Sequence, residues 1–320
     1  MELSFIRIAF HIEEETGVGY TGELSLDRPI GIQIEEAIAV MKSMFEHVRI
    51  SKQIPLAELR TRVVPIIRLS VERLHLFQLF ALLPSKQDYL HRHSFAVGAF
   101  SMLIGKWLRM PEQELLQLTT AALLHNVGKT QIPAELLGKP DKLTEDEYET
   151  VKRHTVLGFE LIRRTVGATH RQAIVALQHH ERNDGSGYPF GLKGDRLDPF
   201  SRIVAAADVF HAMLSDKAYR SPSPLYEVLR QMEDDSYGTL DPNVVAALIG
   251  KSMQALIGCE VTLTDGTPAK IVLVQPHRLT RPLVQAEIGF IDLSQDYSIH
   301  IHRVRAVPNE TIAARETDDA

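Results

Sequence analysis

The chain has 320 residues, 44% of them hydrophobic, and a formal net charge of -6. This length can hold about two or three domains with real cores, and the acidic balance excludes a protein that coats nucleic acid through a basic surface. The single cysteine, Cys259, excludes a disulfide framework and a multi-cysteine zinc site and fits a reducing compartment. No apolar stretch reaches the roughly 18 residues of a membrane span, and the acidic start is a poor signal peptide. We therefore expect a soluble protein of the cytoplasm with no membrane contact and no nucleic-acid polymer as partner.

Residues 1–85 combine a short strand pattern with long helical patterns. Residues 3–10 could form a strand, and apolar positions at helical spacing predict a helix over 34–50. A second helical pattern spans 56–83, where Pro65 is expected to kink or divide the helix, because proline has no backbone N–H. We interpret this segment as a regulatory or dimerisation region, which makes a homodimer possible.

Residues 86–250 have helical periodicity almost throughout, with short turns between the helices. Thr144 is followed three residues later by Glu147, the pattern of a capping box that begins a helix. A later helix ends at the adjacent histidines His179 and His180. We expect this segment to be one all-helical domain.

The periodicity changes in the C-terminal part of the chain. Alternating apolar residues flank the turn dipeptide Asp265-Gly266, which predicts a β-hairpin, and further alternating stretches follow it. The sequence therefore predicts a mainly α protein in which a small β domain at 251–308 follows the helical domain, with a polar tail at 309–320.

Histidine is the unusual residue of this chain, with 14 copies. A lone histidine in a helix is most often a core or surface residue, but here several accompany Asp208, which lies in the apolar segment AAADVF. A carboxylate buried in such a segment needs a partner, and a metal ion is one of few that suffice. The histidines at suggestive helix positions are His93, His125, His154, His179 and His180.

Two motifs together resemble the HD-GYP family, a branch of the HD metal-dependent phosphohydrolases. The family element HD-x-GK is present as HNVGK at 125–129, and the element HHE-x-x-DGxGYP is present as HHERNDGSGYP at 179–189, complete at its defining positions. The resemblance covers roughly residues 86–250, about half of the chain. It implies an all-helical HD-GYP domain with two divalent metal ions, for which iron or manganese suits the ligands best and zinc is possible.

The resemblance also implies which residues hold the metals. One ion would take His93, His125 and Asp208, and the other would take the remaining three histidines. In the family, an aspartate at the position of Asn126 bridges the two ions, and a glutamate at the position of Tyr89 serves a third ion in some members. Because Tyr89 is not a carboxylate, we expect two metals. The predicted ligands are His93, His125, Asn126, His154, His179, His180 and Asp208.

The family's substrate is the bacterial second messenger cyclic di-GMP, which is cut to pGpG and often on to GMP; some members act on related cyclic dinucleotides.

A metal pair can clamp a phosphodiester and activate the attacking water, and Lys129 would neutralise a phosphate oxygen. We predict Lys129 and Asn126 as catalytic residues. Several of the candidate residues could instead have an ordinary structural role. Lys129 could be a solvated lysine, the loop glycines could form a simple turn, Tyr188 could pack within the loop, and Arg202 could form a structural ion pair. The predicted substrate-binding residues are Lys129, Asp184, Gly185, Gly187, Tyr188, Pro189, Arg202, Lys217 and Arg220. His211 stands where the family usually has aspartate, and we interpret it as supporting a ligand or as structural.

Asn126 has the shape of aspartate without its charge, so it cannot bridge two cations. The missing charge should lower metal occupancy and raise the pKa of the attacking water, and we expect little or no hydrolysis. Two functions therefore remain open, a phosphodiesterase impaired at this position and a degenerate domain that acts as a cyclic dinucleotide receptor or scaffold. A nucleotidase is disfavoured by the GYP element. Every other predicted ligand is present, whereas a naturally decayed site would usually have lost more than one. We therefore favour the interpretation that an aspartate at this position of a phosphodiesterase was deliberately replaced.

Overall fold

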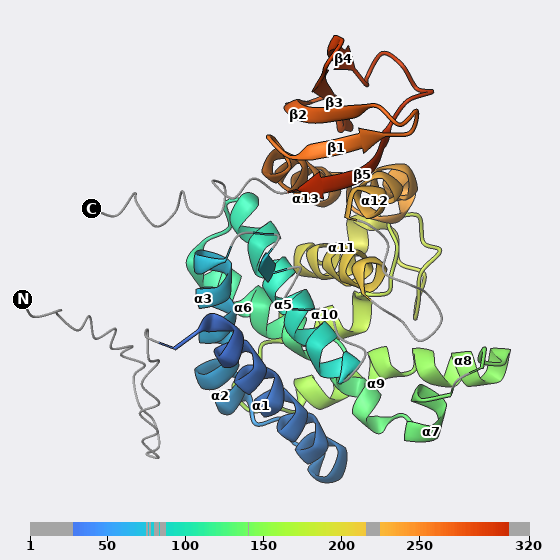
Figure 1. Cartoon of the computed structure of the whole chain (residues 1–320). Helices are drawn as coiled ribbons and strands as arrows, with labels where there is room; N and C mark the ends of the chain where they lie inside the picture. Colours follow the sequence, from blue (N-terminus) through green and yellow to red (C-terminus); the bar gives the residue numbers. More distant parts are fainter. Residues whose placement is uncertain are drawn as a thin grey trace, which may run out of the picture.

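The computed structural model describes residues 28–74, 76, 78–79, 83, 88–139, 141–215 and 225–306. Figure 1 shows a stack of helices with a small sheet at its C-terminal end. The expected mainly helical fold with a C-terminal β domain is confirmed. The strand expected at 3–10, the tail at 309–320, Lys217 and Arg220 lie outside the described residues. None of the described helices has the length and apolar character that crossing a bilayer requires.

The N-terminal region is helical over its described part. Helix α1 (Ile30–Ser51) buries one apolar face and ends at Lys52, whose φ is 61°. The second helical pattern is divided into α2 (Leu56–Glu58), the π-helical turn η1 (Leu59–Val63) and α3 (Val64–Arg73). Pro65 lies in the first turn of α3, where a missing N–H costs nothing, so the predicted division at Pro65 is confirmed.

The helical domain continues from α5 through α13. Its core contains fully buried aromatic side chains, among them Phe95, Phe100 and Phe210. The capping box is confirmed, since Glu147 N donates to Thr144 Oγ1 at 3.3 Å and Thr144 N donates to Glu147 Oε2 at 2.8 Å. The elements are α5 (Tyr89–Trp107), α6 (Glu112–Leu124), the 3-10 turn η2 (Val127–Gln131), α7 (Ala134–Leu137), α8 (Glu145–Lys152), α9 (His154–Arg163), α10 (His170–Gln178), the 3-10 turn η3 (Gly194–Arg196), α11 (Pro199–Leu214), α12 (Leu225–Thr239) and α13 (Pro242–Ala255).

The C-terminal strands form one antiparallel sheet in the order β4-β3-β2-β1-β5. The predicted hairpin is confirmed, with Val261 opposite Ala269 across the turn. The sheet packs on α12 and α13, where the Tyr226 hydroxyl donates to the Thr280 carbonyl at 2.8 Å. The change from helix to strand falls between Ala255 and Glu260, a few residues beyond the predicted domain boundary. The strands are β1 (Glu260–Leu263), β2 (Pro268–Gln275), β3 (Arg278–Ala286), β4 (Gly289–Asp292) and β5 (Ile301–Ala306).

Candidate metal centre

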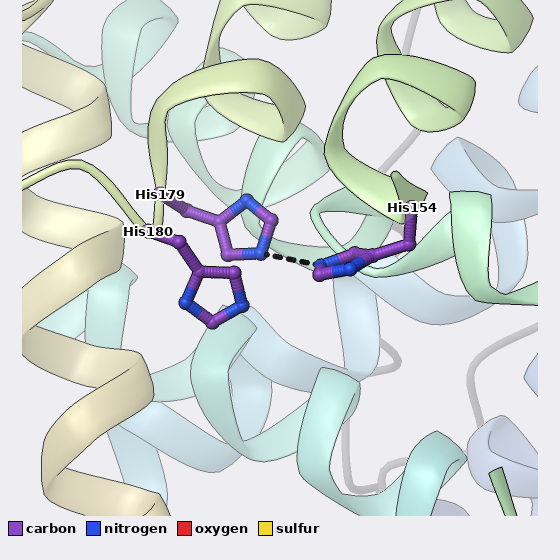
Figure 2. Close-up of side chains that lie close together, drawn as sticks. All are labelled: His154, His179 and His180. Atoms are coloured by element: carbon purple, nitrogen blue, oxygen red, sulfur yellow. Dashed lines mark hydrogen bonds between the residues drawn. The ribbon is translucent and has the colours of Figure 1, made fainter. Parts of the chain in front are cut away.

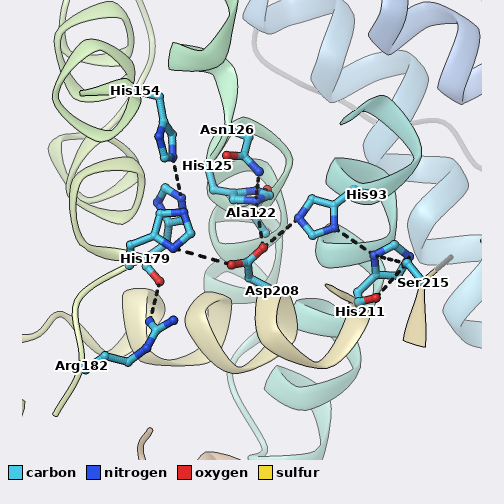
Figure 3. A network of polar contacts seen from close by, with 11 residues as sticks. His93, Ala122, His125, Asn126, His154, His179, Arg182, Asp208, His211 and Ser215 are labelled. Carbon is cyan, nitrogen blue, oxygen red and sulfur yellow. Dashed lines mark hydrogen bonds and ion pairs between the residues drawn. The ribbon is translucent and has the colours of Figure 1, made fainter. Parts of the chain in front are cut away.

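Six predicted ligands converge at the centre of the helical domain (Figure 3). They come from the N-terminal parts of α5 and α9, the C-terminal ends of α6 and α10, and the middle of α11. They form two groups, and the ligand atoms within each group lie within 4.8 Å of one another. All except His180 are buried, so the site is largely closed to bulk water. The groups are His93, His125 and Asp208, and His154, His179 and His180.

Three of the histidines are oriented by the same kind of hydrogen bond. In each, Nδ1 lies 2.6 to 2.9 Å from the helix carbonyl three residues earlier. A carbonyl can only accept, so Nδ1 carries a proton, and in the neutral ring Nε2 keeps its lone pair. Backbone carbonyls commonly fix metal-binding histidines in this way. The pairs are His125 with Ala122, His154 with Val151, and His179 with Ala176.

The Nε2 atoms of His154 and His179 face each other at 3.3 Å, as the dashed line in Figure 2 marks. Burial lowers the pKa of His154 to about 3 and that of His179 well below its ordinary value, so both are neutral near pH 7. Two neutral acceptors cannot bond to each other, and their lone pairs repel unless a cation lies beside both. Three imidazoles with free nitrogens fit a divalent transition metal.

Asp208, a member of the first group, also faces the second. Its Oδ1 is 2.7 Å from His93 Nε2 and 3.7 Å from His125 Nε2, and its Oδ2 is 3.9 Å from His180 Nδ1. Burial alone would raise the pKa of Asp208, but the facing imidazoles hold it well below its ordinary value. The site therefore contains one ionised carboxylate, placed to serve either group.

Asn126 lies beside His125 and is buried. Its Nδ2 is 2.7 Å from His125 Nε2, while no donor within the described part of the chain reaches its Oδ1. Gly128 lets this turn lie directly on α9, since a Cβ there would be 1.9 Å from the carbonyl oxygen of His154. Lys129 follows, and its positive charge lowers the pKa of His154. The HNVGK segment thus places an amide and an ammonium group beside the histidine cluster.

Glu181, which the sequence analysis did not single out, holds the loop that follows the paired histidines. Its side chain is 1% exposed and accepts hydrogen bonds from the backbone N–H groups of Phe190 at 2.7 Å and Leu192 at 2.9 Å. Gly187 is required here because a Cβ would lie 2.4 Å from the Glu181 Cα. The sequence signal that could have identified Glu181 is its position, since it is a charged residue directly between two predicted ligands and a glycine-rich loop.

Tyr188 packs against the metal centre. Its ring stacks on His180 with centroids 4.7 Å apart, and the ammonium group of Lys152 lies 5.5 Å from its centroid. The edge of Tyr148 also contacts it, with centroids 6.4 Å apart. Of the two roles considered for Tyr188, these contacts support packing. Stacking on a nucleobase stays a prediction, as does substrate contact by the adjoining Pro189.

The remaining predicted loop residues have structural explanations. Gly185 has a φ of 86°, which a turn requires of glycine. Asp184 is exposed and accepts from the backbone N–H and hydroxyl of Ser186 at 2.9 and 2.7 Å. Arg202 forms an ion pair with Asp241 at 3.1 Å, which favours the structural alternative for this residue. Their substrate-binding roles stay predictions.

His93 has supporting contacts that sequence reasoning did not specify. His93 Nδ1 lies 2.9 Å from His211 Nδ1, so one ring donates to the other. Ser215 Oγ lies 3.1 Å from the same His211 nitrogen, and the ring of Tyr89 stacks on His93 with centroids 5.3 Å apart. His211 thus contacts a predicted ligand from behind and is not a member of either ligand group.

Known proteins resemble both the sequence and the fold of this chain. The family model described as HD domain matches residues 78–244. A cyclic di-GMP phosphodiesterase of Thermotoga maritima is 40% identical over 179 residues, which cover 54% of this chain and 49% of that protein. A cyclic di-GMP phosphodiesterase of Pseudomonas aeruginosa is 30% identical over 292 residues, covering 86% of this chain and 70% of that protein. The chain thus spans about half the length of the Thermotoga relative. A solved HDG"Y"P protein of Bdellovibrio bacteriovorus shares the fold, with a TM-score of 0.57, 17% identity and coverage of 71% and 73% of the two chains.

Proposed function

The chain belongs to the HD domain family, and from this membership and the buried histidine cluster we propose that it is an HD-GYP-type phosphodiesterase acting on cyclic di-GMP. The observation that carries the proposal is the pair of adjacent three-ligand groups, of which one contains Asp208 and the other lies beside it through His180. The relatives named cyclic di-GMP phosphodiesterases support this substrate over a mononucleotide. A related cyclic dinucleotide is the alternative substrate, and pGpG or GMP would be the product.

We propose that each three-ligand group holds one divalent ion, with iron or manganese preferred and zinc possible. The facing lone pairs of His154 and His179 and the ionised Asp208 fit this assignment. When bound, such a pair supplies Lewis acidity toward a phosphodiester and its attacking water.

The protein's own groups would bind and orient the substrate. Lys129 would place its positive charge where the phosphate gains negative charge, which is the electrostatic contribution expected of such a residue. Burial of the ligands excludes bulk water and strengthens these interactions. The loop from Asp184 to Pro189 would cover the site from the side of His180, against which Tyr188 packs. Lys217 and Arg220 are proposed to contact the phosphates.

Asn126 is proposed to impair turnover, because its amide cannot supply the second anionic oxygen of a bridging carboxylate. A receptor that binds the dinucleotide without cutting it is the alternative function, and the names of the relatives favour the enzyme. That Asn126 replaces an aspartate of the natural chain stays a hypothesis, which the native gene would decide.

The division into domains, the cellular compartment and the oligomeric state are also proposals. We propose a regulatory or dimerising region at 1–85, the phosphohydrolase domain at 86–250 and a β domain at 251–308, in a cytoplasmic protein that can form homodimers. Two ion pairs join α1 to the beginning of α5, Arg92 with Glu35 and Lys42 with Asp88. Through them the N-terminal region could act on the helix that carries His93.

The test compares cyclic di-GMP hydrolysis by the chain, by Asn126→Asp and by Asn243→Asp, each purified anaerobically and loaded with manganese or iron. We expect Asn126→Asp to hold about two ions and to hydrolyse the substrate about 100-fold faster or more, as when a key electrostatic group is restored. Asn243→Asp, an exposed change in α13, is the matched control and should change nothing. Binding without cleavage by every form would support the receptor, and preference for mononucleotides would support a nucleotidase.

A further inference from the structure

The contact between Asn126 and His125 has a consequence beyond the missing charge. We propose that the Asn126 amide blocks the metal-binding nitrogen of His125, so that the group of His154, His179 and His180 takes the first metal ion and the group containing His125 takes a second one more weakly. This inference rests on the metal centre of the proposed function and concerns the order and strength of loading.

His125 has only one nitrogen to offer a metal. Its Nδ1 donates to the Ala122 carbonyl at 2.6 Å, so in the neutral ring Nε2 holds the single free lone pair. Asn126 Nδ2 lies 2.7 Å from this atom. The opposite orientation of the amide would set its oxygen against a lone pair, so the hydrogen-bonding chemistry requires the NH2 group to face His125.

A lone pair that accepts the amide proton cannot bind a metal at the same time. The Oδ1 of Asp208 is farther from this atom, at 3.7 Å, than the amide nitrogen of Asn126, so the amide makes the closer contact. The Asn126 Oδ1, buried and without a donor among the described residues, gains no partner from this orientation. A metal entering this group must therefore break the amide–imidazole bond, and rotation of the amide would turn its oxygen toward the ion.

The other group carries no such block. The Nε2 atoms of His154 and His179 face each other at 3.3 Å, and no described donor forms a hydrogen bond to either. A cation there relieves a repulsion, whereas a cation at His125 replaces a hydrogen bond. This contrast gives the predicted order of loading.

The variant Asn126→Ala separates blocking from simple loss of charge. If Asn126 blocks His125, alanine frees the lone pair and the second ion binds more tightly. If the Asn126 oxygen is instead a weak ligand, alanine removes it and the second ion binds more weakly. Asn126→Asp should strengthen binding under either explanation, so it verifies that the second group can be loaded.

Calorimetric titration of the chelator-treated full chain with Mn²⁺ gives the two affinities without substrate. We expect Asn126→Ala to bind the second ion roughly fivefold more tightly, which corresponds to one net hydrogen bond, with the first affinity unchanged. Asn243→Ala serves as the control at an exposed site. Equal or weaker binding of the second ion by Asn126→Ala overturns the inference while leaving a two-metal enzyme intact, and failure of every form to bind metal overturns both.

A measurement on the unsubstituted chain does not depend on how the variants fold. Nuclear magnetic resonance of the ¹⁵N-labelled, chelator-treated chain should show a scalar coupling across the hydrogen bond between Asn126 Nδ2 and His125 Nε2. The coupling should survive the first equivalent of diamagnetic Zn²⁺ and disappear with the second. Its absence before zinc is added, or its loss with the first equivalent, contradicts the proposal.

Discussion

The substitution Glu181→Gln tests how the glycine-rich loop is held against the metal centre. The carboxylate of Glu181 is buried and accepts two backbone hydrogen bonds, one from each end of the segment Phe190–Leu192. Glutamine has the same shape, but it has one acceptor oxygen and presents an NH2 group to the other backbone N–H. One of the two backbone N–H groups is then buried without an acceptor, and the other donates to a neutral oxygen in place of a carboxylate oxygen.

The expected cost follows from these two bonds. A hydrogen bond to a charged group contributes about 1.5–3 kcal/mol, and an unsatisfied buried donor costs about 1–3 kcal/mol. We expect Glu181→Gln to lower the free energy of opening of this loop by about 3 kcal/mol, which is roughly a 100-fold change in its opening equilibrium. Because Tyr188 packs on His180 from the same loop, that contact should loosen as well.

Hydrogen exchange measures the effect directly. The amides of Phe190 and Leu192 should exchange roughly 100-fold faster in Glu181→Gln, while amides of α5 remain unchanged. Glu46→Gln is the matched control, since Glu46 is exposed and forms an ion pair with Arg49, and such a surface pair contributes less than about 1 kcal/mol. Equal protection of the two loop amides in both variants would refute the role assigned to Glu181.

Two further predictions concern the turn and the histidines. Gly128→Ala should destabilise the protein by about 3 kcal/mol or more in thermal denaturation, because the new Cβ would lie 1.9 Å from the His154 carbonyl oxygen. Gly138→Ala, whose nearest neighbour would be the Ala134 carbonyl at 3.3 Å, is the control, and equal effects would contradict the close approach. After metal removal, stability should fall as the pH drops from 6.5 toward 3, since the pKa of His154 is lowered by burial from 6.5 to about 3 and the unfolded chain binds the extra proton. Denaturation at pH 7 and pH 5 should show a loss of stability that His154→Asn reduces by about 2 kcal/mol in total over this interval, and an unchanged pH dependence would argue against a neutral His154.

The sequence alone predicted the features that depend on short-range patterns. The capping box at Thr144 and the hairpin at Asp265-Gly266 were located because each involves residues only a few positions apart. The division at Pro65 follows from the chemistry of one residue. Seven ligands were predicted from the resemblance to the HD-GYP family, and the structure brings six of them together in two groups.

The contacts that orient these ligands were not predictable in the same way. His93 meets His211 across 118 positions of the chain, and no local pattern relates the two residues. Arg202 finds Asp241 across 39 positions, which the sequence could present only as one of two alternatives. The role of Glu181 depends on where the loop folds back to place Phe190 and Leu192 near its carboxylate. Such partners are set by the packing of distant helices and loops, which periodicity does not encode.

Asn126 shows why charge alone does not describe a substituted metal site. An amide in place of a carboxylate would weaken the attraction for both proposed ions, an effect that the sequence already predicts. The structure adds that the substituted group is itself a donor, directed at the one lone pair that His125 can offer. The same side chain therefore removes an attractive group and introduces a competing one. Because no comparable donor among the described residues bonds to the facing nitrogens of His154 and His179, the proposed competition concerns the group that contains His125. On the proposed two-metal site, an isosteric change at this position would therefore separate the two ions in affinity, and the orientation of a single amide would determine which one is weakened.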